Sequence, residues 1–301
     1  MKRILLLFSV QSRLHKLAEP ERLTELLNDT SRAQFEFAYF NDLSFYLDNN
    51  EASFIDEVSG KHLDDYDAIY IRHWGIPESQ GHGLAIARYC KLKNIPFIDR
   101  EVWRVGSLNK LTQYINLFEA VVSFPKTFMA DARHIATGLE RYGFSYPFIL
   151  KAAQASRGEN NFLVKSEAQL QAIVNEQPDT AFVLQEYIEN NGDYRVLVCG
   201  DKVELIIRRT AAGDTHLNNT SQGGNAEIVD ANVLPPRALD DCIKAAKFFG
   251  RDFAGVDIVL DAKGNHYCFE VNRAPQVENS SFEQEKAAIL SKFLVELASD
   301  K

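Results

Sequence analysis

Two adjacent stretches decide the fold of this chain: AGVDIVL at residues 254–260 and HYCFEVN at residues 266–272. Each is apolar enough for a buried strand, yet each also carries carboxylate or amide groups. Side chains alternate along a strand, so Glu270 and Asn272 point to the same face. A four-residue hairpin loop at residues 262–265 places Asp257 opposite Glu270, on that same face. The pattern therefore predicts a hairpin with three oxygen-bearing side chains on one face.

These three side chains are candidate metal ligands. Two carboxylates buried side by side are unfavourable unless a cation neutralises them, and hard oxygen ligands favour Mg²⁺ or Mn²⁺. We therefore expect Asp257, Glu270 and Asn272 to bind metal. The alternative is a pair of carboxylates that faces solvent on an edge hairpin.

A second candidate site lies upstream, where the apolar stretch FILK at residues 148–151 is followed by the small-residue stretch QASRGEN at residues 154–160. A lysine after a buried strand can reach phosphate oxygens, and backbone N–H groups near Ser156 and Gly158 can bind them. Lys151 is thus a candidate phosphate ligand. The same stretch is equally compatible with a plain β-turn.

Two further stretches continue this pattern. VLQEYI at residues 183–188 runs from an apolar strand into a polar hinge, whose edge backbone groups can pair with adenine; the candidates are Gln185, Glu186, Tyr187 and Ile188. DYR at residues 193–195 and LIIRR at residues 205–209 place Arg195, Arg208 and Arg209 in strand-like segments. Arginines in such positions usually contact carboxylates or phosphates.

The whole chain has an α/β pattern that we divide into lobes at residues 1–98, 99–185 and 186–301. In the first lobe, strands at residues 3–10, 34–40, 68–72 and 95–98 alternate with helices at 19–28 and 83–93, which indicates parallel βαβ units. The second lobe has helices at 107–118, at 132–142 and after Ser166, and strands at 126–129, 148–152, 161–164 and 182–185. The third is mostly strands, with one helix from Pro235-Pro236 to Phe249-Gly250 and a closing helix at 283–297.

Composition excludes several classes of protein. A net charge of −9 argues against nucleic-acid binding, and no apolar run is long enough for a membrane helix. The opening MKRILLLF is typical of a strand and lacks a signal-peptide cleavage site, so we expect a cytoplasmic protein. The cysteines have no metal-binding spacing and are expected to be buried thiols: Cys90, Cys199, Cys242 and Cys268. A homo-oligomer is compatible with the sequence.

The order of these motifs resembles the ATP-grasp superfamily, specifically its RimK-like branch of peptide and amino-acid ligases. The resemblance covers about residues 95–297 and, more loosely, the N-terminal lobe. It implies an ATP-grasp fold of three lobes, with a Rossmann-like N-terminal lobe and ATP between the last two.

The resemblance also implies roles for individual residues. Lys110 and Lys151 would bind the ATP phosphates, Glu186 and Tyr187 the adenine, and Asp193 the ribose. Asn218 and Asn219 would lie near the phosphates and metals, and Arg209 would stabilise the transferring phosphoryl group. The ligands of two Mg²⁺ or Mn²⁺ ions would be Asp257, Glu270 and Asn272.

Candidate substrate residues lie outside this set. Arg72, in RHWG at residues 72–75, follows a strand of the first lobe, where loops tend to line ligand crevices, although a surface turn fits equally well. The family commonly has Ala-Ser-Pro-Gly where this chain has RAPQ at residues 273–276, and a His-Arg pair where it has SQ at residues 221–222. We expect Arg72, Arg195, Arg208 and Arg273 to bind substrate, whose identity these departures leave open.

The predicted function is ATP-dependent ligation of a carboxylate to an amine through an acyl phosphate. From the resemblance, the expected reaction adds glutamate or another amino acid to a peptide or protein C-terminus. Repeated addition of glutamate would give poly-glutamate. One alternative is a ligase that joins two small metabolites, as in dipeptide or glutathione-type ligases. Another is a non-catalytic ATP-binding regulator, which the complete set of lysines and metal ligands disfavours.

Overall fold

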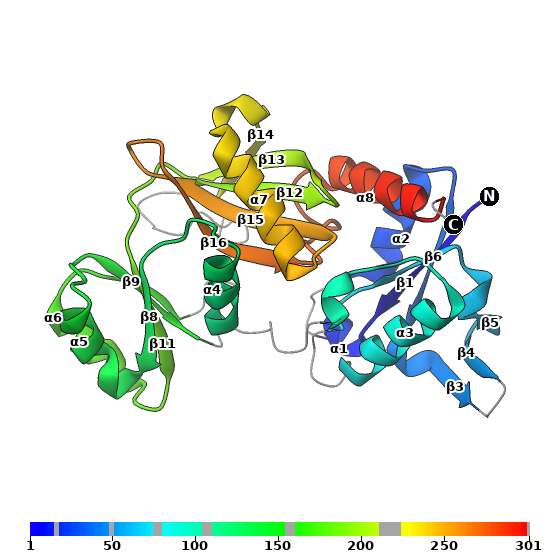
Figure 1. The fold of residues 1–301 in the computed structure, drawn as a ribbon, viewed down its shortest axis with the longest axis horizontal. Coiled ribbons are helices and arrows are strands. Elements are labelled where there is room, and N and C mark those ends of the chain that lie inside the picture. The colour runs from blue at the N-terminus through cyan, green and yellow to red at the C-terminus, as the bar shows by residue number, and fades with distance from the viewer. Residues whose placement is uncertain are drawn as a thin grey trace.

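The computed structural model describes residues 1–14, 18–47, 51–74, 80–103, 110–153, 160–210 and 224–299. Their strands form four sheets, and helices cover the larger ones, so the predicted α/β class is confirmed (Figure 1). In Figure 1 the sheet that carries β8, β9 and β11 lies at one end and the N-terminal sheet at the other. The C-terminal sheet lies between them.

The N-terminal sheet is parallel, as predicted. Its order is β2-β1-β6-β7, formed by Gln34–Tyr39, Arg3–Phe8, Ala68–Ile71 and Phe97–Ile98. Apolar side chains of β1 are buried on both faces, as expected for a sheet covered by helices. The accompanying helices are α1 (Val10–Leu14), α2 (Pro20–Asp29) and α3 (Gln80–Lys93).

A small antiparallel sheet was not predicted from the sequence. It consists of β3 (Leu43–Leu47), β4 (Ala52–Asp56) and β5 (Lys61–His62). Its strands are short, and the apolar residues of LSFYL and ASFID do not alternate regularly with polar ones, so the local pattern is weak.

The second large sheet is antiparallel, in the order β10-β9-β11-β8. Its strands are Asn161–Val164, Phe148–Ala152, Ala181–Glu186 and Thr127–Asp131. Helices α5 (Ala132–Arg141) and α6 (Glu167–Glu176) pack against this sheet around one apolar cluster. Helix α4 (Lys110–Glu119) instead joins the apolar cluster of the C-terminal sheet.

The C-terminal sheet is antiparallel, in the order β14-β13-β12-β15-β16. Its strands are Asn225–Ile228, Lys202–Thr210, Asp193–Cys199, Phe253–Leu260 and His266–Arg273. Helix α7 (Pro236–Phe249) covers one face and ends at Gly250, whose φ of 72° is left-handed and suits glycine. Helix α8 (Glu283–Leu297) packs on α2 and on the N-terminal sheet, so the two ends of the chain share one core.

Short 3-10 turns complete the described elements: Phe40–Asp42, Leu63–Asp65, Arg100–Trp103 and Ala231–Val233. The four cysteines are buried and free, as predicted. Within the described ranges, no helix is long and apolar enough to cross a membrane.

Candidate active site

The hairpin of β15 and β16 has the predicted pairing but not the predicted loop. Leu260 pairs with His266, so five residues, 261–265, connect the strands, and the predicted loop of four residues is wrong. Asp257 nevertheless pairs with Glu270, because a β-bulge at Phe269 shifts the register by one residue. The bulge therefore brings the two carboxylates opposite each other.

Two side chains of α4 hold this bulge, and sequence reasoning did not identify either. The hydroxyl of Tyr114 donates to the carbonyl of Phe269 at 3.0 Å, and Nε2 of Gln113 approaches the same oxygen at 3.4 Å. The amide of Val271 donates back to Oε1 of Gln113 at 3.1 Å. The only sequence signal was a pair of polar residues on the buried side of an amphipathic helix.

Asp257 lies in a dense network of ion pairs. Arg195 donates to both of its oxygens, at 2.8 and 2.7 Å, and Nη2 of Arg209 lies 3.2 Å from Oδ1. Arg209 also donates to both oxygens of Asp193, at 2.7 Å each. Burial by itself raises the pKa of Asp257, but the two guanidinium groups outweigh burial and lower that pKa to about 2.

Asn272 belongs to the same face, since its Nδ2 donates to Oδ2 of Asp257 at 3.1 Å. Glu270 precedes it by two residues and pairs with Asp257, so it shares that face as well. Asp257 is 7% exposed, whereas Glu270 is exposed on an edge strand. The alternative prediction, a pair of carboxylates that faces solvent on an edge hairpin, thus holds for Glu270 but not for Asp257.

Two lysines approach Glu270, one from helix α4 and one from strand β9 of the neighbouring sheet. Lys110, the first residue of α4, donates to the carbonyl of Ala152 at 3.0 Å. Nζ of Lys151 lies 5.2 Å from the ring centroid of Phe269. Burial lowers the pKa of Lys151 to about 8, and the charge of Glu270 acts in the opposite direction. Both ammonium groups therefore lie within the electrostatic reach of Glu270.

Gln185 positions these groups through its side chain. Its Oε1 accepts from Lys151 Nζ at 2.7 Å and lies 3.2 Å from the hydroxyl of Tyr114, and its Nε2 donates to Thr127 at 2.8 Å. Gln185 is fully buried. The side chain predicted to bind nucleotide is thus committed to protein contacts.

The predicted hinge follows directly. Strand β11 ends at Glu186, whose Oε1 accepts the amide of Lys126 at 2.7 Å. Tyr187 and Ile188 are half-buried in the segment that leads to β12. This segment connects the sheet that carries Lys151 to the sheet that carries Asp257, Glu270 and Asn272.

A second cluster of basic residues lies where β6 and β16 end. Arg72 follows β6, and Arg273 is the last residue of β16. The guanidinium of Arg273 lies over the ring of Trp74, 5.0 Å from its centroid. Next to it, Arg251 and Glu101 form a buried ion pair at 2.7 Å. Strands β6 and β16, which end at Ile71 and Arg273, more than 200 residues apart in the chain, therefore meet here.

Comparison with known proteins identifies the architecture. The family model described as a RimK-like ATP-grasp domain matches residues 107–294. The chain belongs to the RimK-like ATP-grasp family. A relative from Cellvibrio japonicus (strain Ueda107), named probable alpha-L-glutamate ligase, is 28% identical over 275 residues, covering 90% of this chain and 88% of the relative. The ribosomal protein bS6–L-glutamate ligase of Salmonella schwarzengrund (strain CVM19633) is 28% identical over 240 residues, covering 78% of each chain.

Solved structures show the same fold. The ATP-grasp ligase PsnB, complexed with a minimal precursor, Mg and ADP, superposes with a TM-score of 0.72 at 18% identity over 98% of both chains. D-alanyl-alanine synthetase A from Vibrio cholerae O1 gives a TM-score of 0.66 at 16% identity, over 99% of this chain and 98% of the other. This RimK-like chain thus has the ATP-grasp fold and is an ATP-dependent ligase that joins a carboxylate to an amine.

The residues of this ATP-grasp site fit a metal–nucleotide complex. Asp257, Glu270 and Asn272 supply only oxygen donors on one face, as Mg²⁺ and Mn²⁺ prefer. Lys151 has a lowered pKa because it is buried without a direct anionic contact among the described residues, and a polyphosphate would supply that anion. The fit therefore rests on both charge and donor chemistry.

Some predicted site residues lie elsewhere. Arg208 points away from Asp257, because its guanidinium contacts Glu227 at 3.4 Å and the carbonyl of Asn191 at 3.2 Å. Strand alternation explains why neighbouring Arg208 and Arg209 have different partners. The remaining predicted residues lie outside the described residues: Ser156, Gly158, Asn218 and Asn219.

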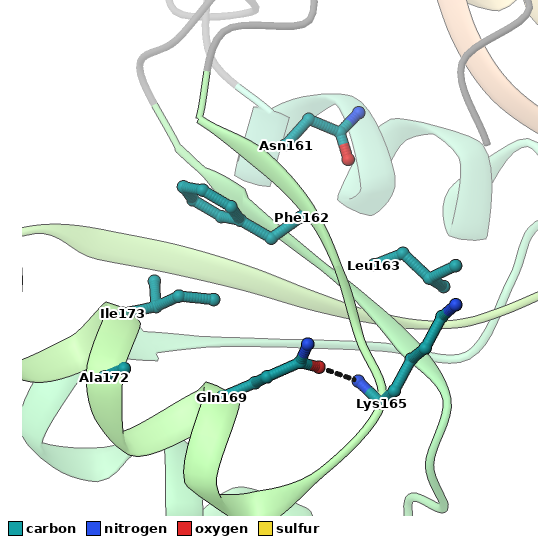
Figure 2. A pocket seen from close by; sticks show the side chains of 7 residues that line it. All are labelled: Asn161, Phe162, Leu163, Lys165, Gln169, Ala172 and Ile173. Carbon is teal, nitrogen blue, oxygen red and sulfur yellow. Dashed lines mark hydrogen bonds between the residues drawn. The ribbon is translucent and has the colours of Figure 1, made fainter. Parts of the chain in front are cut away.

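A cavity of about 560 Å³ lies between β10 and α6, away from these groups. Figure 2 shows its lining, which includes Phe162, Lys165 and Ile173, with Gln169 accepting the backbone amide of Lys165 at 2.7 Å. Among the described residues, none of those predicted to form the site lines this cavity.

Proposed function

We propose that this ligase activates the C-terminal carboxylate of a peptide or protein with ATP and joins it to the amine of glutamate or another amino acid. The observation that carries the proposal is the placement of Lys110 and Lys151 near Glu270, across from Asp257 and Asn272. Cationic groups for phosphates thus face an oxygen-ligand set for metal. The glutamate-ligase names of the relatives support the choice of amino acid.

The proposed nucleotide site lies between the lobes at residues 99–185 and 186–301, which follow the N-terminal lobe at 1–98. Lys110 and Lys151 would bind the phosphates, and the hinge at Glu186, Tyr187 and Ile188 the adenine. Asp193, held by Arg209, would bind the ribose. The predicted loops with Ser156, Gly158, Asn218 and Asn219 belong to the same proposal.

Asp257, Glu270 and Asn272 would hold Mg²⁺ or Mn²⁺, two ions in all. Bound metal offsets the negative charge of the outer phosphates. The named contacts of Arg209 involve Nε and Nη2, so we propose that Nη1 contacts the transferred phosphoryl group. Arg195 fixes the orientation of Asp257 through its two hydrogen bonds.

The reaction has two steps. A carboxylate oxygen attacks the γ-phosphorus of ATP, the bond to ADP breaks, and an acyl phosphate forms. The amine nitrogen then attacks the acyl carbon, phosphate leaves with the bonding electrons, and the amine proton passes to solvent. The protein contributes orientation and charge stabilisation and needs no covalent nucleophile.

The test is to incubate the enzyme with ATP, Mg²⁺, a peptide and each amino acid, and to identify products by mass spectrometry. We expect ADP and phosphate, a peptide extended by glutamate, and a hydroxamate when hydroxylamine replaces the amine. AMP and pyrophosphate as stoichiometric products would contradict the mechanism. Ligation of free amino acids with no peptide extension would instead identify a small-metabolite ligase.

A further inference from the structure

Arg72 is a buried cation for which the described residues supply no hydrogen-bond acceptor. It is 1% exposed, and Nε, Nη1 and Nη2 are all buried without a partner. Its guanidinium lies 5.6 Å from the ring centroid of Phe8 and 5.3 Å from that of Tyr70. Aromatic faces offset only part of the cost of burying a guanidinium, so this group is suited to an anion.

Further unpartnered donors lie beside it. Nη1 of Arg273 and Nε1 of Trp74 are buried without a hydrogen bond among the described residues. Arg273 stacks over Trp74, two residues after Arg72. A group of N–H donors with no protein acceptor is the arrangement that a carboxylate or phosphate satisfies.

The imidazole of His73 does not change the positive charge that Arg72 and Arg273 carry. Burial lowers the pKa of His73 to about 3, and the charges of Arg72 and Arg273 contribute to the decrease. His73 is therefore neutral at physiological pH. Nε of Arg273 lies 3.5 Å from Oε2 of Glu101, and Arg251 binds the same carboxylate more closely, through two hydrogen bonds at 3.0 and 2.7 Å.

We propose that Arg72 and Arg273 together bind the α-carboxylate of the amine substrate, the carboxylate that must not be phosphorylated. This assignment rests on the proposed function. Two guanidinium groups reduce the nucleophilicity of a bound carboxylate, which suits a group that is only held in place.

Stability measurements separate a binding role from a structural one. Arg72→Met should keep or raise the melting temperature of the ligand-free protein, because it removes a buried unpaired cation. The matched control is Arg251→Met, which should lower the melting temperature because it removes the two hydrogen bonds that Arg251 donates to the buried carboxylate of Glu101. A decrease for Arg72→Met as large as that for Arg251→Met would overturn the proposal.

The ligand is tested by melting-temperature shifts with L-glutamate, its α-amide isoglutamine, and inorganic phosphate, without ATP. We expect a shift with glutamate in the unsubstituted protein, none with isoglutamine, and none with glutamate in Arg72→Met. A phosphate shift equal to that of glutamate, or a glutamate shift that survives in Arg72→Met, would overturn the assignment.

Kinetics provides the second readout. In the unsubstituted enzyme, kcat/KM should be at least about 100-fold higher for glutamate than for isoglutamine, because the amide leaves both guanidinium groups unpaired. Arg72→Met should reduce this preference to below about tenfold. An unchanged preference would contradict the role of Arg72. If the unsubstituted enzyme ligates neither compound but still shows the glutamate shift, the proposed function fails and the carboxylate site stands.

Discussion

Arg195 binds Asp257 through two parallel hydrogen bonds, from Nε to Oδ1 at 2.8 Å and from Nη2 to Oδ2 at 2.7 Å. Asp257 is thus both a proposed metal ligand and a partner of two arginines, the half-buried Arg195 and the buried Arg209. Glu270, opposite it in the hairpin, is exposed and makes no such ion pair among the described residues. The two carboxylates should therefore respond differently to the same substitution.

Glu270→Ala should abolish ATP turnover while the fold remains intact. The side chain is exposed, so its removal costs little stability, yet it contributes a proposed metal ligand. We expect ADP formation to fall by at least about 100-fold with a nearly unchanged melting temperature. Unchanged turnover would contradict the assigned role.

Asp257→Ala should destabilise the protein as well as inactivate it. The substitution leaves the half-buried Arg195 without its carboxylate and the buried Arg209 with Asp193 alone, which costs up to about 3–5 kcal/mol of unfolding free energy. Urea unfolding of this variant beside Glu270→Ala measures the difference. Equal stability of the two variants would show that the arginines do not depend on Asp257.

Tyr114→Phe should loosen the bulge that brings Glu270 opposite Asp257. The hydroxyl donates to the carbonyl of Phe269, and Gln185 is its second partner. Both acceptors keep other donors, so the expected loss of stability is only about 1 kcal/mol. Activity should decrease more than stability does, with a raised Mg²⁺ requirement. A loss of stability without any change in the Mg²⁺ dependence would show that the hydroxyl of Tyr114 does not position Glu270 through the bulge.

Asp99 should make the stability of the protein fall as pH rises. Burial raises its pKa to about 8 from 3.8, and the carboxylates of Asp252 and Glu101 contribute. Between these two values the folded state holds a proton that the unfolded state has lost, so this residue's contribution to stability decreases with pH. Asp99→Asn removes that dependence. In urea unfolding, the free energy of unfolding of the variant relative to that of the unsubstituted protein should be higher at about pH 8 than at about pH 5.

The amides of Asp252 and Phe253 donate to Oδ1 of Asp99 at 2.9 and 3.2 Å, and asparagine retains an oxygen for both. A variant whose stability difference stays constant between the two pH values would show that Asp99 is ionised in the folded protein.

The sequence by itself determined the strands and helices whose patterns are local. Strands Phe148–Ala152 and Asn161–Val164 and the closing helix Glu283–Leu297 have the predicted bounds. Alternation alone placed Glu270 and Asn272 on one face. The order of motifs indicated the RimK-like ATP-grasp family, which the comparisons confirm. These conclusions depend on neighbouring residues and on spacing, which a sequence contains directly.

Tertiary structure decided which groups meet across long separations. The bulge at Phe269 depends on Gln113 and Tyr114, which are more than 150 residues away in the chain. Arg72 and Arg273 approach each other only because the ends of β6 and β16 converge. No local pattern encodes such contacts, because they arise when apolar faces of distant elements bury each other and thereby fix the polar groups between them.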